Sequence, residues 1–291
     1  MTTPPTNTLD HIVHLSPPGS LKEISAKWKD LGFNVVQGGK HADGLTENAL
    51  VAFEDGSYIE LISFTNPITH YHPDSPSRRA REKHPWGKKE PGYIDFALLG
   101  NNGEPSIAAT INKRAEEDES GVKYEDEVNG GRTRTDGEIL KWLITAPSQS
   151  SAIGGGDIRG RLPFFCGDLT PRNLRVPHEK TDITHPNTAV GIAFVRILTS
   201  HDQFDGLRRQ YGTILHASST SSEEVEFSLK TPAVDSTAAP SLFLRPPQSE
   251  SEKEWLKTRG AGLYEVGVKV QDSSRVAETS TPYGRIITLS P

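Results

Sequence analysis

The sequence is poor in cysteine, with Cys166 the single one among 291 residues. One cysteine excludes an internal disulfide framework and fits a reducing compartment, so we expect a cytoplasmic protein. No segment approaches the roughly 18 consecutive apolar residues that span a bilayer. The opening residues MTTPPTNT also lack the basic and apolar parts of a signal peptide. We therefore expect no membrane partner.

Basic residues are not in excess, and the formal net charge is −6. This balance argues against a dedicated nucleic-acid binder. No Gly-x-Ser-x-Gly elbow is present, and the glycine run at 154–156 lacks the Gly-Lys-Ser/Thr of a phosphate-binding loop. With 34% hydrophobic and 24% charged residues, the composition is that of an ordinary globular protein. A small-molecule partner is the class left open, with a monomer or a homodimer as the assembly.

The most informative stretch is residues 38–64, GGKHADGLTENALVAFEDGSYIELISF. We expect Gly38 and Gly39 to form a turn, followed by a polar loop and by strands over 49–53 and 58–64. An Asp-Gly pair between the two strands is typical of a hairpin. Alternation in the second strand places Tyr58 and Glu60 on one otherwise apolar face. A carboxylate on such a face costs free energy unless it is paired, and metal coordination is one such pairing.

The order strand, helix, strand, strand, strand recurs along the chain. Residues 9–15 (LDHIVHL) read as a strand on which Leu9, His11, Val13 and Leu15 share a face. Ser20 is an expected N-cap for a helix over 21–31, and a strand over 33–37 follows. Further strands are expected over 93–99, 125–128, 140–145, 162–166, 190–199, 225–229, 242–244, 264–270 and 285–289, with helices over 76–83, 106–118 and from about 204 to 211. The sequence therefore predicts an α+β fold of repeated βαβββ units.

These segments carry a family resemblance. LDHIVHL, the 38–64 stretch, HPWGKKEPGYIDFALLG, LPFFCGD and THPNTAVGIAFVRI together resemble the glyoxalase-like domain family of the vicinal-oxygen-chelate superfamily, which includes glyoxalase I and extradiol dioxygenases. The resemblance implies tandem βαβββ modules curled into a barrel around a pocket. We assign a first module to 9–66, a connection to 67–91, a second module to 92–178, and a third, partial module with short closing strands to 186–291.

The resemblance also implies a divalent metal held by a first-strand His and a fourth-strand Glu, which match His11 and Glu60. Zn, Fe, Ni and Mn all suit imidazole and carboxylate ligands. The alternative from the residues alone is a buried His–Glu hydrogen bond that stabilises the sheet. Where a second module would supply further ligands, this chain has Tyr93-Ile94-Asp95-Phe96 and Cys166-Gly167-Asp168, so Asp95, Asp168 and His185 remain as candidate replacements.

Further residues are candidates for catalysis and for substrate binding. His41 and His185 are candidate catalytic bases together with Glu60, and Asn48, Tyr58 and Trp86 are candidate substrate contacts. Each has a structural alternative: turn chemistry for Asn48, a strand-start turn for His185, and packing of the connection onto the barrel for Trp86. His70, His72 and His84 read as solvated loop histidines, and Cys166 as a small buried hydrophobe.

The resulting hypothesis is a small-molecule enzyme of the lyase, isomerase or dioxygenase kind. Its metal would chelate adjacent substrate oxygens and stabilise an anion. Two alternatives stay open: a metal-free protein that binds or sequesters a small molecule, and metal-free acid–base catalysis in the same cavity.

Overall fold

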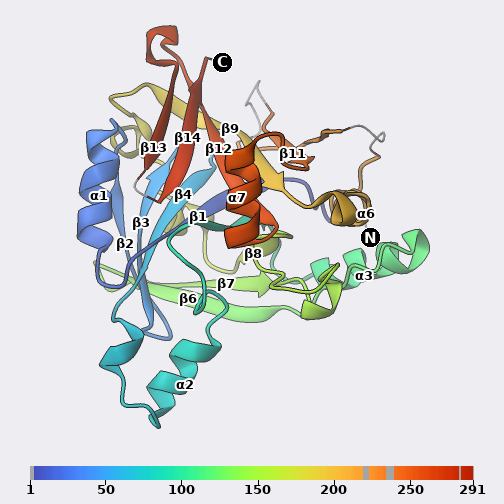
Figure 1. Ribbon diagram of the computed structural model, residues 1–291. Helices are drawn as coiled ribbons and strands as arrows, with labels where there is room; N and C mark the ends of the chain where they lie inside the picture. The colour runs from blue at the N-terminus through green and yellow to red at the C-terminus, as the bar shows by residue number, and fades with distance from the viewer. Residues whose placement is uncertain (1–2, 219–222, 234–238, 282, 291) are drawn as a thin grey trace.

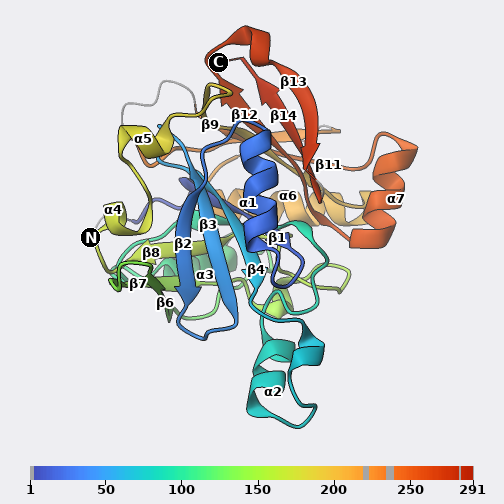
Figure 2. The same cartoon turned by 90° about the vertical axis from the view of Figure 1, so that its left-hand side faces the viewer.

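The computed structural model describes residues 3–218, 223–233, 239–281 and 283–290. Two sheets form the molecule: a closed eight-stranded barrel of order β1-β4-β3-β2-β6-β7-β8-β5 and an open six-stranded sheet of order β10-β11-β9-β12-β14-β13. Figures 1 and 2 show the open sheet stacked above the barrel, with α2 projecting away from both. This mixed architecture confirms the predicted α+β fold of curled βαβββ modules.

The barrel consists of two βαβββ modules joined edge to edge. Its strands are β1 (Leu9–Ser16), β2 (Val36–His41), β3 (Thr46–Ala52), β4 (Tyr58–Phe64), β5 (Gly92–Leu99), β6 (Val128–Arg134), β7 (Ile139–Thr145) and β8 (Phe164–Asp168). The module helices are α1 (Leu21–Asp30) and α3 (Ile107–Asp118). In each module the first and last strands pair in parallel, whereas β1 with β5 and β2 with β6 pair antiparallel across the two seams.

The open sheet and its helices repeat the βαβββ order of the barrel modules in shortened form. Its elements are β9 (Ala189–Leu198), α6 (His201–Leu215), β10 (Val225–Ser228), β11 (Ser241–Arg245), α7 (Glu250–Arg259), β12 (Gly262–Val270), β13 (Ala277–Thr281) and β14 (Gly284–Leu289). The central pair β9 and β12 is antiparallel like β1 and β5, and β11 and β14 run parallel to β9 and β12. Shorter elements in the chain are η1 (Ile68–His70), α2 (Pro76–Lys83), η2 (Gln149–Ser151), α4 (Arg172–Arg175), α5 (Lys180–Ile183) and η3 (Ser273–Arg275).

The two larger apolar clusters of the described residues form most of the core. One lies inside the barrel and includes Val13, Ile62 and Phe164. The larger cluster joins the outside of the barrel to the open sheet, because residues such as Leu9 and Trp28 share it with Val195 and Val266. None of the helices within the described residues is long and apolar enough to cross a bilayer.

Two glycine pairs lie inside strands, so β2 and β6 run later in the chain than the predicted strands over 33–37 and 125–128. Gly38 and Gly39 were expected in a turn but lie inside β2, and Gly130 and Gly131 lie inside β6. A Cβ on Gly38 would meet the Asn48 side chain at 2.0 Å, and one on Gly39 would meet a main-chain oxygen of β6 at 2.1 Å. These glycines allow the strands to approach closely rather than to turn.

Two further expectations need correction. Ser20 precedes α1, but its side chain makes no capping hydrogen bond and donates instead to the Pro17 carbonyl at 2.6 Å. Leu9 does not share a face with His11, because the β1–β5 pairing shifts register between these two residues. Leu9 therefore packs outside the barrel with Ile12, while His11 faces the interior.

Candidate functional site in the barrel

A cavity of about 590 Å³ opens inside the barrel, and both modules line it. From the first module it receives His11, His41, Asn48, Tyr58 and Glu60, which were all singled out in the sequence. The connection and the second module add Trp86, Arg132, Trp142, Arg159, Phe164 and Cys166. The barrel thus brings together His11, His41, Asn48, Tyr58, Glu60 and Trp86, whereas the candidate replacement ligands Asp95, Asp168 and His185 do not line the cavity.

His11 is held in one orientation by its neighbours. The register shift in β1 directs Asp10 toward the same side, and its carboxylate contacts His11 Nδ1 at 2.7 Å. The Tyr58 ring stacks on the imidazole at 4.6 Å, and Phe164 meets it edge-on at 5.4 Å. The Asp10 carboxylate can only accept a hydrogen bond, so Nδ1 carries a proton, and Nε2 faces Glu60 in the cavity.

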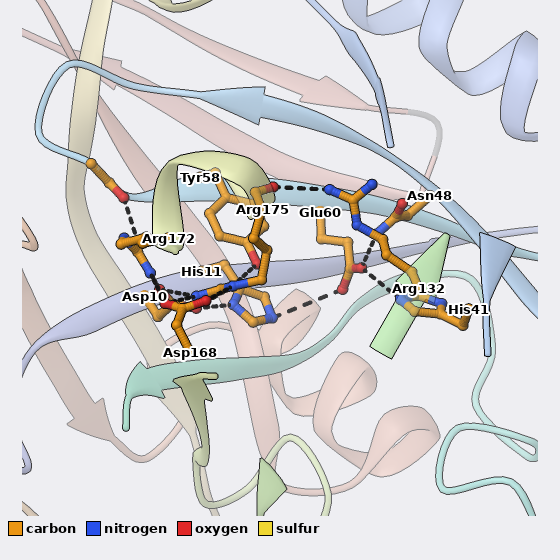
Figure 3. A network of polar contacts seen from close by, with 11 residues as sticks. Asp10, His11, His41, Asn48, Tyr58, Glu60, Arg132, Asp168, Arg172 and Arg175 are labelled. Atoms are coloured by element: carbon orange, nitrogen blue, oxygen red, sulfur yellow. Dashed lines mark hydrogen bonds and ion pairs between the residues drawn. The ribbon is translucent and has the colours of Figure 1, made fainter. Parts of the chain in front are cut away.

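Glu60 lies at the centre of the polar groups (Figure 3). Asn48 Nδ2 donates to its Oε1 at 2.5 Å, and His41 Nε2 lies 3.6 Å from the same oxygen. Its Oε2 lies 3.9 Å from His11 Nε2. Alternation along β4 predicted this inward orientation, and the carboxylate is nearly buried at 6% exposure. The pair is too far apart for the direct His11–Glu60 hydrogen bond that was the structural alternative.

His41 ends β2 rather than lying in a loop, and its Nδ1 contacts Thr46 Oγ1 at 2.7 Å. Burial lowers the pKa of His41 despite the nearby Glu60 and Asp43 carboxylates, so the ring is neutral at neutral pH. Nε2 of His41, like that of His11, faces the Glu60 carboxylate. Two imidazoles and one carboxylate therefore converge on one region of the cavity.

An ion-pair network holds Asp10, the carboxylate that contacts His11. Arg175 Nη1 contacts Asp10 at 3.0 Å and donates to the Tyr58 hydroxyl at 2.6 Å, and its Nε contacts Asp168 at 2.5 Å. Arg172 adds a contact to each of the two carboxylates. Burial would raise the pKa of Asp10, but Arg172 and Arg175 outweigh it and hold that pKa well below its ordinary value. Asp10 therefore stays ionised as a partner for His11.

The remaining predicted residues have structural contacts of their own. Trp86 lines the cavity and also donates from Nε1 to Asp95 at 2.8 Å, so it packs the connection as well as facing the cavity. Asp95 and Asp168 are engaged by arginines. His185 lies outside the cavity lining, where it accepts from the Asn34 amide at 2.9 Å and contacts the Ala52 carbonyl at 2.9 Å.

Sequence reasoning missed several cavity residues. His84 was expected in solvent but lines the cavity, and burial lowers its pKa to about 4. Arg132 and Arg175 carried no recognisable signal in the sequence, because one follows the Gly130-Gly131 pair and the other lies in a polar segment after the last barrel strand. Arginine is usually exposed, so only the folded structure shows that these two side chains are buried in the barrel.

The comparisons with known proteins agree with this architecture. The sequence matches the glyoxalase-like domain family over residues 9–214. The chain belongs to this family. No curated protein matches the sequence. A hypothetical protein from Staphylococcus aureus has a similar structure, with a TM-score of 0.69, 13% identity, and coverage of 98% of this chain and 99% of that one. A mutant of 4-hydroxymandelate synthase from Streptomyces coelicolor is similar at a TM-score of 0.51 and 15% identity, covering 96% of this chain and 78% of that one.

A divalent metal is common in the superfamily to which this glyoxalase-like chain belongs, and His11 and Glu60 are its candidate ligands here. Two ligands about 2.1 Å from a tetrahedral ion lie about 3.4 Å apart, whereas His11 Nε2 and Glu60 Oε2 are 3.9 Å apart. Among the described residues, no three His, Cys, Asp or Glu side chains are arranged to hold a metal ion.

The second module supplies no matching ligands. In the first module His11 pairs with Tyr58, two residues before Glu60, and in the second Ala97 pairs with Phe164, two residues before Cys166. The positions equivalent to His11 and Glu60 are therefore Ala97 and Cys166. Ala97 has no donor atom, and burial raises the pKa of the Cys166 thiol to about 12, so the thiol is protonated. The residues present do not fit a complete metal site.

Proposed function

We propose that this glyoxalase-like chain is an enzyme of the isomerase or lyase kind, in which Glu60 moves a proton of a small molecule bound in the barrel cavity. The observation that carries the proposal is the Glu60 carboxylate, which lies in a buried cavity with Asn48 bound to one oxygen and the His11 imidazole facing the other. A carboxylate taken out of water and held in one orientation is suited to act as a general base.

In this mechanism Glu60 takes a proton from a carbon next to a carbonyl group, and the electron pair moves to the carbonyl oxygen. His11 Nε2, whose ring is oriented by Asp10, accepts or returns a proton at a neighbouring substrate oxygen. Asn48 holds Oε1 of Glu60, and neutral His41 lies beside the same oxygen. Phe164, Trp142 and Trp86 exclude water from the reacting atoms.

The test is exchange of carbon-bound hydrogen in D₂O, measured by NMR with pyruvate, dihydroxyacetone and phenylacetone as carbon acids. We expect the wild type to accelerate exchange for at least one of them. Glu60→Gln should lower that rate by about 10²- to 10⁴-fold, the usual contribution of a positioned base. Glu47→Gln is the matched control, because Glu47 lies on the neighbouring strand β3 and outside the cavity lining. Full activity in folded Glu60→Gln would contradict the proposal.

A metal-dependent reaction is the alternative that the family suggests. Elemental analysis of protein purified without chelators or metal-affinity resin separates the two, with wild type compared with His11→Ala. We expect well under one equivalent of Zn, Fe, Ni or Mn per chain in both. A near-stoichiometric ion in the wild type that is lost from His11→Ala would replace the metal-free mechanism.

A second candidate function is binding without catalysis. The positions Ala97 and Cys166, which offer no ligand or base to the cavity, favour it. Saturable binding of a small molecule by wild type, without hydrogen exchange in any carbon acid, would support a binding or sequestering protein.

A further inference from the structure

The arginines of the barrel cavity differ in how their charges are balanced. Arg175 is paired with Asp10 and Asp168, and Arg159 Nε lies 2.9 Å from the Asp95 carboxylate. Arg132 is 4% exposed and forms no ion pair with any carboxylate among the described residues. Its guanidinium donates to two main-chain carbonyls, those of Gly38 and Arg175.

Such an arrangement leaves both charge and donors for a ligand. A guanidinium has five N–H donors in a rigid fork that matches a carboxylate. Burial lowers the pKa of Arg132, and Glu60 opposes that shift without forming an ion pair with the guanidinium. A buried cation without a paired anion is costly, so an anionic ligand would be stabilised at this position.

The apolar part of the cavity indicates what accompanies the anion. Trp142, Ile144 and Phe164 line it beside the polar residues. A Cβ on Gly130 would meet Trp142 Nε1 at 2.3 Å, so this glycine on β6 lets the indole lie across the strand that carries Arg132. A flat apolar group thus has a surface next to the guanidinium.

We propose that Arg132 binds the carboxylate of the substrate and that the apolar body of the substrate lies against Trp142 and Phe164. The inference rests on the proposed function for its placement beside Glu60, and it names the substrate class as small carboxylic acids with an apolar group. Carboxylate binding at Arg132 places the rest of the ligand between the two modules, within reach of Glu60 and His11.

The experiment compares phenylacetate with phenylacetamide, which share a shape and differ in charge, by isothermal titration and ligand-observed NMR. We expect wild type to bind the carboxylate at least about tenfold more tightly, the scale of one charge-assisted hydrogen bond. Arg132→Gln should weaken phenylacetate binding by about 10- to 100-fold and leave phenylacetamide nearly unchanged. Arg132→Lys, which keeps the charge without the fork, should fall between them.

Arg134→Gln is the matched control, because Arg134 lies two residues further along β6, pairs with Asp136 at 2.9 Å and does not line the cavity. It should bind both ligands as wild type does. Equal binding of both ligands by wild type, including no binding of either at millimolar concentration, overturns the inference. So does an equal loss for both ligands in Arg132→Gln. If that variant does not fold, the wild-type preference and Arg132→Lys decide.

Glu60→Gln separates this inference from the proposed function. It should lose hydrogen exchange while it keeps the preference for phenylacetate, because the guanidinium is unchanged. Carboxylate preference without exchange in wild type would uphold Arg132 as the anion site and remove the proton-transfer role. Hydrogen exchange without a preference for phenylacetate would uphold the proton-transfer role of Glu60 and remove Arg132 as the anion site.

Discussion

At the scale of single residues, His14 shows how a histidine is used when it takes no part in the site. It is fully buried on the outside of β1, between the edges of Trp28 and Tyr93 at 5.5 and 5.2 Å. Its Nε2 contacts Thr281 Oγ1 at 3.0 Å, and its Nδ1 has no partner among the described residues. Burial lowers the pKa of His14 to about 3.

This buried imidazole should make stability depend on pH. The unfolded chain protonates His14 near its ordinary pKa of 6.5, whereas the folded chain does so only near 3. Between these values the unfolded state binds more protons, so the free energy of unfolding falls as the pH falls, by about 1.4 kcal/mol per unit. Between pH 7 and pH 5, the free energy of unfolding measured with urea should fall by about 2 kcal/mol less for His14→Phe than for wild type. Identical pH dependence in the two proteins would refute this account.

The same scale shows what the sequence can reveal of the site. Period-two alternation in β4 correctly directed Tyr58 and Glu60 inward, because a regular strand obeys a local rule. Asp10 was missed as the partner of His11, because it depends on a register shift that only the pairing with β5 creates. Arg132 was missed for a related reason. Its role depends on having no paired carboxylate among the described residues, and a sequence does not show which charges are paired.

At the scale of elements, the four-residue helix α4 has a large effect for its length. It lies after the last barrel strand, and Arg175 from its last position reaches Asp10 on β1, Tyr58 on β4 and Asp168 at the end of β8. This short helix at the end of the predicted second module is therefore a clamp on one end of the barrel (Figures 2 and 3). No local pattern in its sequence indicated this, because the partners are distant along the chain.

Removing that clamp should destabilise the barrel. Arg175→Met leaves Asp10 buried with one cation fewer, and breaking a buried pair from one side costs about 3–5 kcal/mol. Arg134→Met, on a partly exposed arginine paired with Asp136, should cost less than about 1 kcal/mol. Urea unfolding measures both. Asp10→Asn added to Arg175→Met should recover part of the loss, since the unpaired charge is then gone, and a further additive loss would contradict the argument.

At the scale of the whole molecule, the open sheet covers an apolar outer face of the barrel. Its outer residues Leu9, Ile12 and Trp28 share one apolar cluster with Val195 and Val266 of the open sheet. The family match, over residues 9–214, runs through the barrel and into α6, so it crosses this boundary. Recurrence of the βαβββ order predicted the extra units, but only the packed structure shows that they cover the back of β1, the strand that carries His11.

We therefore expect the two sheets to fold as one unit. A fragment of residues 1–188 retains all eight barrel strands but loses β9 to β14. Its exposed apolar face should leave it without a cooperative urea transition and with strong binding of the dye ANS, whereas the full chain should unfold in one transition followed alike by tryptophan fluorescence and circular dichroism. A fragment that unfolds cooperatively would show that the barrel is independent. It would also mean that His11 and Glu60 keep their geometry without the open sheet, and the hydrogen-exchange assay on the same fragment would measure that directly.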